Sequence, residues 1–114
     1  MTVKSRRVVL GSEAEKDFIR ILAFNREGFG PRQEVIYETT ILKALAELDS
    51  GPEVARSIAR DDLRPAVRSL HVARQGRRGR HVIFYRVTNT DLIQVVRILH
   101  DATDFAQHVS TDGD

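Results

Sequence analysis

Several residue types and segments are scarce in this chain or missing from it. It contains no cysteine, so neither a disulfide framework nor a thiolate metal site can form. No apolar run approaches the roughly 20 residues that a membrane-spanning helix needs. The first residues, MTVKSRRVVLGSEAEKD, have too short an apolar stretch for a signal peptide and soon turn acidic. We therefore expect a cytoplasmic protein with no membrane association.

The positive charges are concentrated in the second half of the chain, although the net charge is only +2. Residues 53–100 hold ten arginines against four acidic residues, whereas the remainder holds eight basic against twelve acidic residues. Arginine suits bidentate pairing with carboxylates or phosphates. Two partners fit such a surface, nucleic acid and an acidic protein segment. The alternative is a solvated basic surface that only keeps the protein soluble.

The first half of the chain predicts a short strand and two helices. Residues 6–10 (RRVVL) are β-prone, and Ser12 with Glu15 forms a capping-box pattern that starts a helix ending near Glu27. Pro31 suits the first position of a second helix. Because few residues separate the helices, they should form an antiparallel helical hairpin. The residues expected on its inner face are Ala14, Phe18, Ile21, Leu22 and Asn25 in the first helix and Val35, Ile41, Leu42, Leu45 and Leu48 in the second.

The second half predicts three strands, over residues 67–74, 80–88 and 92–99, from alternation and from β-branched and aromatic residues. Residues 50–66 are a linker bounded by prolines. Residues 75–79 (QGRRG), named here the arginine tip, join the first two strands. The order βααβββ indicates an α+β fold, with two helices packed on one face of a largely antiparallel sheet.

The end of the chain should contain a structured turn and then a polar terminus. We expect Phe105 to fold back on the sheet. Residues 1–109 are interpreted as one domain and residues 110–114 as a disordered tail.

Arg97 interrupts an apolar strand, VVRIL. A buried guanidinium needs a partner because it cannot lose its charge. Strict alternation places Arg97 on one face with Ile93, Val95 and Leu99. We expect Arg97 to anchor the C-terminal turn by pairing with Asp101 or Asp104, and His100 to cap the same turn. The alternative is that Arg97 contacts a partner directly.

Several linked segments of this sequence resemble the RelE/ParE superfamily of bacterial toxins, and its ParE branch most closely. A short strand is followed by SEAEKDF, and DLRPAVRSL, HVIFYRV and RILH then follow in that order. The resemblance runs from about residue 7 to residue 109. It implies a RelE/ParE-like fold and the toxin role in a type II toxin–antitoxin module.

The resemblance also implies partners. A cognate ParD-like or similar antitoxin would bind the toxin in a hetero-oligomer, the toxin would reach operator DNA only through that antitoxin, and the target would be DNA gyrase. No cofactor and no metal are expected. We expect contact with the target or the antitoxin from arginines of the basic half and one histidine: Arg68, Arg74, Arg77, Arg78, Arg80, Arg86, Arg97 and His100.

The alternative activity within the superfamily is RelE-type, ribosome-dependent cleavage of mRNA. That chemistry needs a general base, a general acid and cations around the phosphate. The only tyrosines are Tyr37 and Tyr85, and Tyr85 alternates with core residues, so no tyrosine follows the last strand. His71 and His81 could face each other, but a third metal ligand at a plausible spacing is missing. We therefore assign no catalytic residue and favour the gyrase inhibitor.

Overall fold

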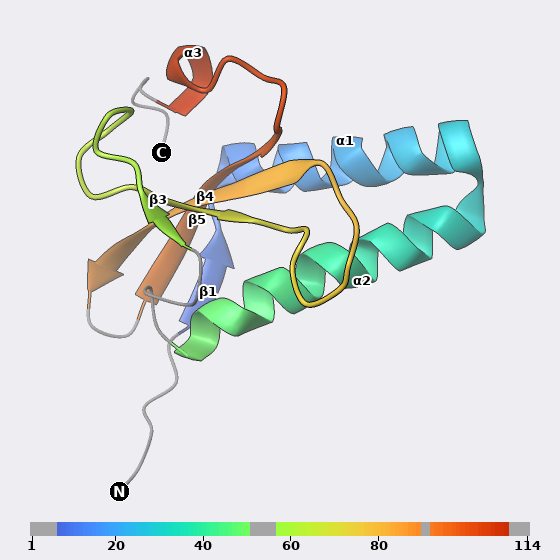
Figure 1. The fold of residues 1–114 in the computed structure, drawn as a ribbon, viewed down its shortest axis with the longest axis horizontal. Coiled ribbons are helices and arrows are strands. Elements are labelled where there is room, and N and C mark those ends of the chain that lie inside the picture. The colour runs from blue at the N-terminus through green and yellow to red at the C-terminus, as the bar shows by residue number, and fades with distance from the viewer. Residues whose placement is uncertain (1–6, 51–56, 90–91, 110–114) are drawn as a thin grey trace, which may run out of the picture.

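The helical hairpin and a mixed sheet form two layers in the computed structural model, which describes residues 7–50, 57–89 and 92–109 (Figure 1). The elements in chain order are β1 (Arg7–Leu10), α1 (Ser12–Phe29), α2 (Pro31–Glu47), a 3-10 turn η1 (Leu48–Ser50), β2 (Ile58–Ala59), β3 (Arg68–His71), β4 (His81–Asn89), β5 (Leu92–His100) and α3 (Ala106–Val109). None of these helices is long and apolar enough to cross a membrane.

The sheet has the strand order β1-β5-β4-β3-β2. Strand β1 runs parallel to β5, and every other neighbouring pair is antiparallel. This confirms the predicted α+β fold and largely antiparallel sheet. Strand β2 was not predicted, because its two residues lie inside the proline-bounded linker. The predicted disorder of residues 110–114 concerns a segment outside the described residues.

The two helices follow each other with one residue between them. Gly30 has φ +95°, a conformation that glycine adopts without steric cost, and Pro31 begins α2 as expected. The capping-box prediction is wrong by one residue, because α1 already begins at Ser12 and Gly11 is its N-cap.

The predicted inner face of the second helix is partly confirmed: Ile41, Leu45 and Leu48 are buried as expected, but Val35 and Leu42 are not. Tyr37, Ile41 and Ala44 are buried, whereas Val35 and Leu42 are 60% and 48% exposed. The apolar residues of α2 thus occupy two faces. Sequence periodicity alone could not show which face meets the sheet, and the face that does not meet it remains apolar.

Strand β5 contains a β-bulge, and two hydrophobic clusters lie on opposite faces of the sheet. Phe84 pairs with Arg97 while Tyr85 pairs with Val95, so Val96 is the extra residue. The larger cluster lies between the helical hairpin and the sheet, and the smaller one lies on the opposite face. Phe105 is partly buried and packs against the smaller cluster, where its ring lies 4.8 Å from that of Phe84 between centroids. The expected return of Phe105 to the sheet is therefore confirmed.

Candidate functional site

Arg97 pairs with helix α1 and not with the C-terminal turn. Its Nε and Nη2 donate to the two carboxylate oxygens of Asp17 at 2.8 and 2.9 Å. Asp17 Oδ2 also accepts the backbone N–H of Ile98 at 2.9 Å. The prediction of Asp101 or Asp104 as the partner of Arg97 is wrong. The bulge at Val96 also makes strict alternation fail: Ile98 packs in the cluster under the helical hairpin, and Leu99 packs on the other face, so the predicted common face of Leu99 with Ile93 and Val95 is wrong.

Asp17 is only 4% exposed, yet it remains ionised. Burial by itself raises the pKa of Asp17, but hydrogen bonds from Arg97, from the Ile98 backbone and from Arg20 outweigh it, so the pKa is lowered. The pair therefore links α1 to β5 through two charge-assisted hydrogen bonds.

Two other arginines hold the arginine tip against the end of α2. Arg74 donates to Glu47 Oε1 at 2.9 Å, and Arg77 donates to Glu47 Oε2 at 2.6 Å. The hydrogen bond from Arg74 is the main reason that the pKa of Glu47 is lowered. Arg74 is 8% exposed, so this side chain supports the tip and offers little surface to a partner.

The remaining predicted arginines lie on other parts of the sheet or at the tip. Arg68 donates to the Ser57 hydroxyl at 2.9 Å, and Arg86 donates to Gln94 at 3.0 Å. Arg78 is exposed and has no hydrogen-bond or ion-pair partner among the described residues. The structure thus does not bring the eight predicted contact residues together into one surface.

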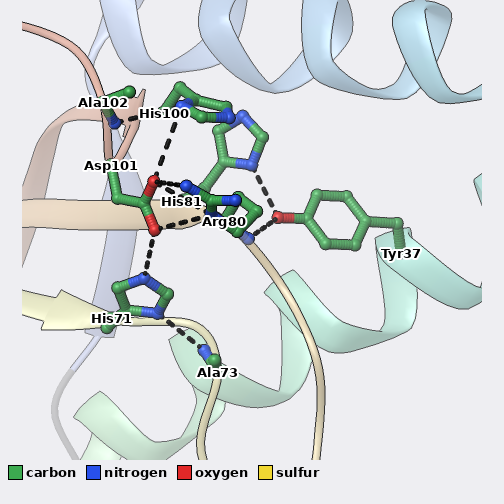
Figure 2. Close-up of polar contacts among 8 residues, drawn as sticks. All are labelled: Tyr37, His71, Ala73, Arg80, His81, His100, Asp101 and Ala102. Carbon is green, nitrogen blue, oxygen red and sulfur yellow. Dashed lines mark hydrogen bonds and ion pairs between the residues drawn. The ribbon is translucent and has the colours of Figure 1, made fainter.

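Three histidines and an aspartate do come together at the end of β5. Asp101 accepts Nε and Nη2 of Arg80 and Nε2 of His71 at 3.0–3.1 Å (Figure 2). The hydrogen bond from Arg80 is the main cause that holds the pKa of the Asp101 carboxyl well below its usual range. His71 lies opposite Val82 and His81 opposite His100, so the predicted His71–His81 pairing is wrong.

The hydrogen bonds of the three rings assign one tautomer to each. Nδ1 of His71 accepts the Ala73 N–H, and Nδ1 of His100 accepts the Ala102 N–H, each at 3.0 Å. The second bond confirms that His100 caps its turn. With an Nδ1 acceptor, a neutral imidazole carries its proton on Nε2.

Tyr37 fixes the third ring. The Tyr37 hydroxyl accepts the Arg80 backbone N–H at 3.0 Å, so its own hydrogen is available for Nδ1 of His81, 2.6 Å away (Figure 2). Burial is the main cause that lowers the pKa of His81 to about 4, and the neighbouring charge of His100 acts in the same direction. Burial likewise raises the pKa of Tyr37. The pair is therefore neutral at pH 7.

We expect the free energy of unfolding to fall by about 1–2 kcal/mol between pH 7 and pH 5 because of His81. The pKa of His81 is about 4 in the folded chain and 6.5 for an unperturbed histidine, so the unfolded chain takes up the proton first as the pH falls. Urea unfolding at each pH measures the loss. The variant His81→Gln should lack this part of the slope, and His108→Gln, at an exposed position, should retain it. An unchanged slope in His81→Gln would contradict the assignment.

A pocket of about 710 Å³ opens beside these residues. Its lining comes from the ends of α1 and α2 that meet at Gly30, from the arginine tip and from the facing ends of β4 and β5: Phe24, Asn25, Phe29, Gln33, Tyr37, Ala73, Arg77, Arg78, Gly79, Arg80, His81 and His100. Sequence reasoning included four of these residues among the contacts and missed Tyr37, Phe24 and Phe29. For Phe24 and Phe29, the sequence offered one indication: both aromatic residues lie close to the glycines that end the first helix.

Among the described residues, no group of three His, Asp or Glu side chains is placed to hold a metal ion. The residues that line the pocket offer apolar contact, cationic guanidinium groups and imidazole N–H donors. This combination suits binding of an anion attached to an apolar group.

Comparison with known proteins agrees with this architecture. Residues 8–105 match the family model described as the ParE toxin of the type II toxin–antitoxin system parDE. Toxin ParE1 of Mycobacterium tuberculosis, from two strains, is 31% identical over 100 residues, covering 88% of this chain and 94% of the relative. The solved structure of a chromosomal ParDE system from P. aeruginosa has the same fold, with a TM-score of 0.67 at 20% identity, over 85% of this chain and 97% of that one. The chain belongs to the ParE toxin family of type II toxin–antitoxin systems.

Proposed function

We propose that this toxin inhibits DNA gyrase and is neutralised by a cognate antitoxin that covers the helical hairpin. The observation that carries the antitoxin surface is a set of large apolar side chains on α1 and α2 that are 48–69% exposed. They are Ile19, Phe24, Phe29, Val35, Ile36 and Leu42. Exposed apolar groups in such number on two packed helices mark an interaction surface.

Charge supports an acidic antitoxin segment. The arginine tip lies next to the apolar end of the helical hairpin, because both line one pocket. An acidic amphipathic segment could place its apolar side chains on the hairpin and its carboxylates on the arginines. Strand β1 lies at one edge of the sheet and could accept an added strand. Under this proposal, operator DNA contacts the toxin only through the antitoxin.

The contact residues expected from the sequence now fall into two groups. Arg74 and Arg97 are held by carboxylates inside the domain, so we propose that they maintain the fold. Arg77, Arg78, Arg80 and His100 line the pocket, and we propose that these four meet a partner. Arg68 and Arg86 lie on the sheet and stay candidates for the target surface.

Gyrase inhibition is favoured over mRNA cleavage because few groups suit acid–base catalysis. Tyr85 is fully buried, and the Tyr37 hydroxyl is engaged by His81 and by the Arg80 backbone. Nδ1 of His100 is occupied by the turn that it caps. The pKa of His81, at about 4, lies far below the range where a general base works best at pH 7. This surface suits occupation of a site better than turnover of a substrate.

One experiment tests both parts of the proposal. The purified toxin should inhibit supercoiling by purified gyrase by roughly tenfold or more at a small molar excess, and an equimolar amount of the antitoxin from the adjacent reading frame should restore it. The control is the same gyrase with the antitoxin alone. Brief expression should also induce the DNA-damage response while bulk mRNA stays intact.

Two outcomes would contradict the proposal separately. Ribosome-dependent cuts in mRNA with normal supercoiling would replace gyrase by the RelE-type target. Failure of the adjacent protein to bind the toxin, or to restore supercoiling, would remove the antitoxin part.

A further inference from the structure

The pocket beside Tyr37 has apolar walls at its outer end. Phe24 and Phe29 line it and are each 69% exposed, so both belong to the pocket and to the apolar surface of the helical hairpin. Tyr37 and Ala73 also line the pocket. A chain lying along the hairpin could therefore direct one side chain into this pocket without leaving the surface.

The imidazole groups in the pocket are hydrogen-bond donors. Nδ1 of His100 accepts the Ala102 N–H, and we assign Nδ1 of His81 as the acceptor of the Tyr37 hydroxyl, because that hydroxyl already accepts the Arg80 N–H. Each ring therefore carries its proton on Nε2. Neither Nε2 has a hydrogen-bond partner within the described residues, and both rings line the pocket. Two N–H donors are thus available to an acceptor from outside.

The charge around the pocket is also one-sided. Arg77, Arg78 and Arg80 line it, and none of the carboxylates in the described ranges does. Glu47 is shared by Arg74 and Arg77, and Asp101 is bound by Arg80. Three guanidinium groups thus share two carboxylates, and a fourth, Arg78 at the tip, is exposed and outside these pairs. The pocket is short of anionic acceptors.

We propose that this pocket is the anchor site of the antitoxin and receives one aromatic or long aliphatic side chain with an acidic residue beside it. The apolar side chain would lie between Phe24, Phe29 and Tyr37. The carboxylate would bind Arg78 and the free N–H groups of the histidines. This inference rests on the proposed antitoxin surface, and it assigns the strongest contact on that surface to one place.

A peptide fits these features better than a nucleotide does. The walls are continuous with the exposed apolar residues of both helices, which a nucleotide would leave uncovered. A buried apolar anchor next to a charge-assisted hydrogen bond is the usual composition of an interface hot spot. A short RNA or single-stranded DNA could still use the arginines, so it is included in the test.

The test is calorimetric titration of the purified toxin with its full-length cognate antitoxin. Arg78→Glu and Phe29→Ala should each weaken binding by about tenfold or more. The matched controls are Lys43→Glu and Val87→Ala, which change an exposed cation and an exposed apolar residue that lie outside the pocket and outside the apolar set assigned to the antitoxin. Each control should change the affinity by less than about threefold. Urea unfolding of every variant verifies that it folds.

NMR signals of the imidazole rings provide a second readout. On saturation with the antitoxin, the Nε2 signals of His81 and His100 should shift more than that of His71, which already donates to Asp101. His108, an exposed residue of α3, serves as the distant reference.

The outcomes separate this inference from the proposed function. If wild-type toxin binds the antitoxin but pocket and control variants weaken binding equally, or none does, the pocket is not the anchor and the antitoxin surface stands. If Arg78→Glu and Phe29→Ala weaken binding of an RNA or DNA 10-mer but leave the antitoxin affinity unchanged, the pocket binds nucleic acid and the inference is wrong. If the antitoxin does not bind wild type, the proposed function fails first.

Discussion

Replacing Asp17 by alanine is expected to lower the free energy of unfolding by about 3–5 kcal/mol, because it leaves the Arg97 guanidinium without its carboxylate inside the domain. Asp17 and Arg97 have side chains that are only 5% and 17% exposed. The substitution also removes the acceptor of the Ile98 backbone N–H, which is buried, and an unpaired buried donor carries its own cost. Urea unfolding at pH 7 measures the difference.

Two controls separate the stranded charge from the loss of a side chain. Arg20 also donates to Asp17, but its side chain is 65% exposed, so Arg20→Ala should cost less than about 1 kcal/mol. The double variant Asp17→Leu with Arg97→Met should recover much of the stability, because no unpaired charge remains. Equal stability of Asp17→Ala and wild type would show that the pair contributes nothing, and Arg97 would return to the candidates for partner contact.

Replacing Gly79 by alanine is expected to lower the free energy of unfolding by about 1–3 kcal/mol through overpacking. A Cβ at this position would lie 2.5 Å from Val72 Cγ2 and 3.0 Å from the Tyr37 hydroxyl. Val72 is fully buried and cannot easily move, so Tyr37 should move instead. The hydrogen bond to His81 would then lengthen or break.

The effect on His81 distinguishes this substitution from an ordinary loss of stability. Once Tyr37 no longer covers the ring, the pKa of His81 should rise from about 4 toward 6.5, which an NMR titration follows directly. The matched control is Gly28→Ala, since a Cβ there meets nothing within 4 Å. That change in helix α1 should be neutral or stabilising by up to about 1 kcal/mol. A Gly79→Ala variant with an unchanged His81 titration would contradict the role of the close contact.

The elements that depend on local patterns were predictable from the sequence. The helical hairpin follows from apolar spacing and from Pro31, and the strands follow from β-branched residues and turn signals. The partner of Arg97 was not predictable, because Asp17 lies 80 positions away and only the fold brings α1 beside β5. The bulge at Val96, after which Leu99 faces away from Ile93 and Val95, was not predicted either. A bulge adds one residue to a strand and leaves no signal in an alternating pattern.

The candidate site was only partly visible for the same reason. A run of arginines correctly indicated the tip, but not that Glu47 holds two of them. Tyr37 and His81 are distant in sequence and meet only because α2 packs on the end of β4. The exposed residues Val35 and Leu42 were predicted to be core residues, because apolar spacing in a sequence does not distinguish a helix face that packs on the sheet from one that stays exposed.

The position of β1 has a consequence for how the chain folds during synthesis. Its neighbour in the sheet is β5, with Arg7 beside Leu92, and α1 is joined to the same strand through Asp17 and Arg97. Contacts of such high sequence separation form late and fold slowly. A ribosome must therefore make the chain through β5 before the first strand and helix find their partner, so β1 and α1 lack these contacts until β5 has been synthesised.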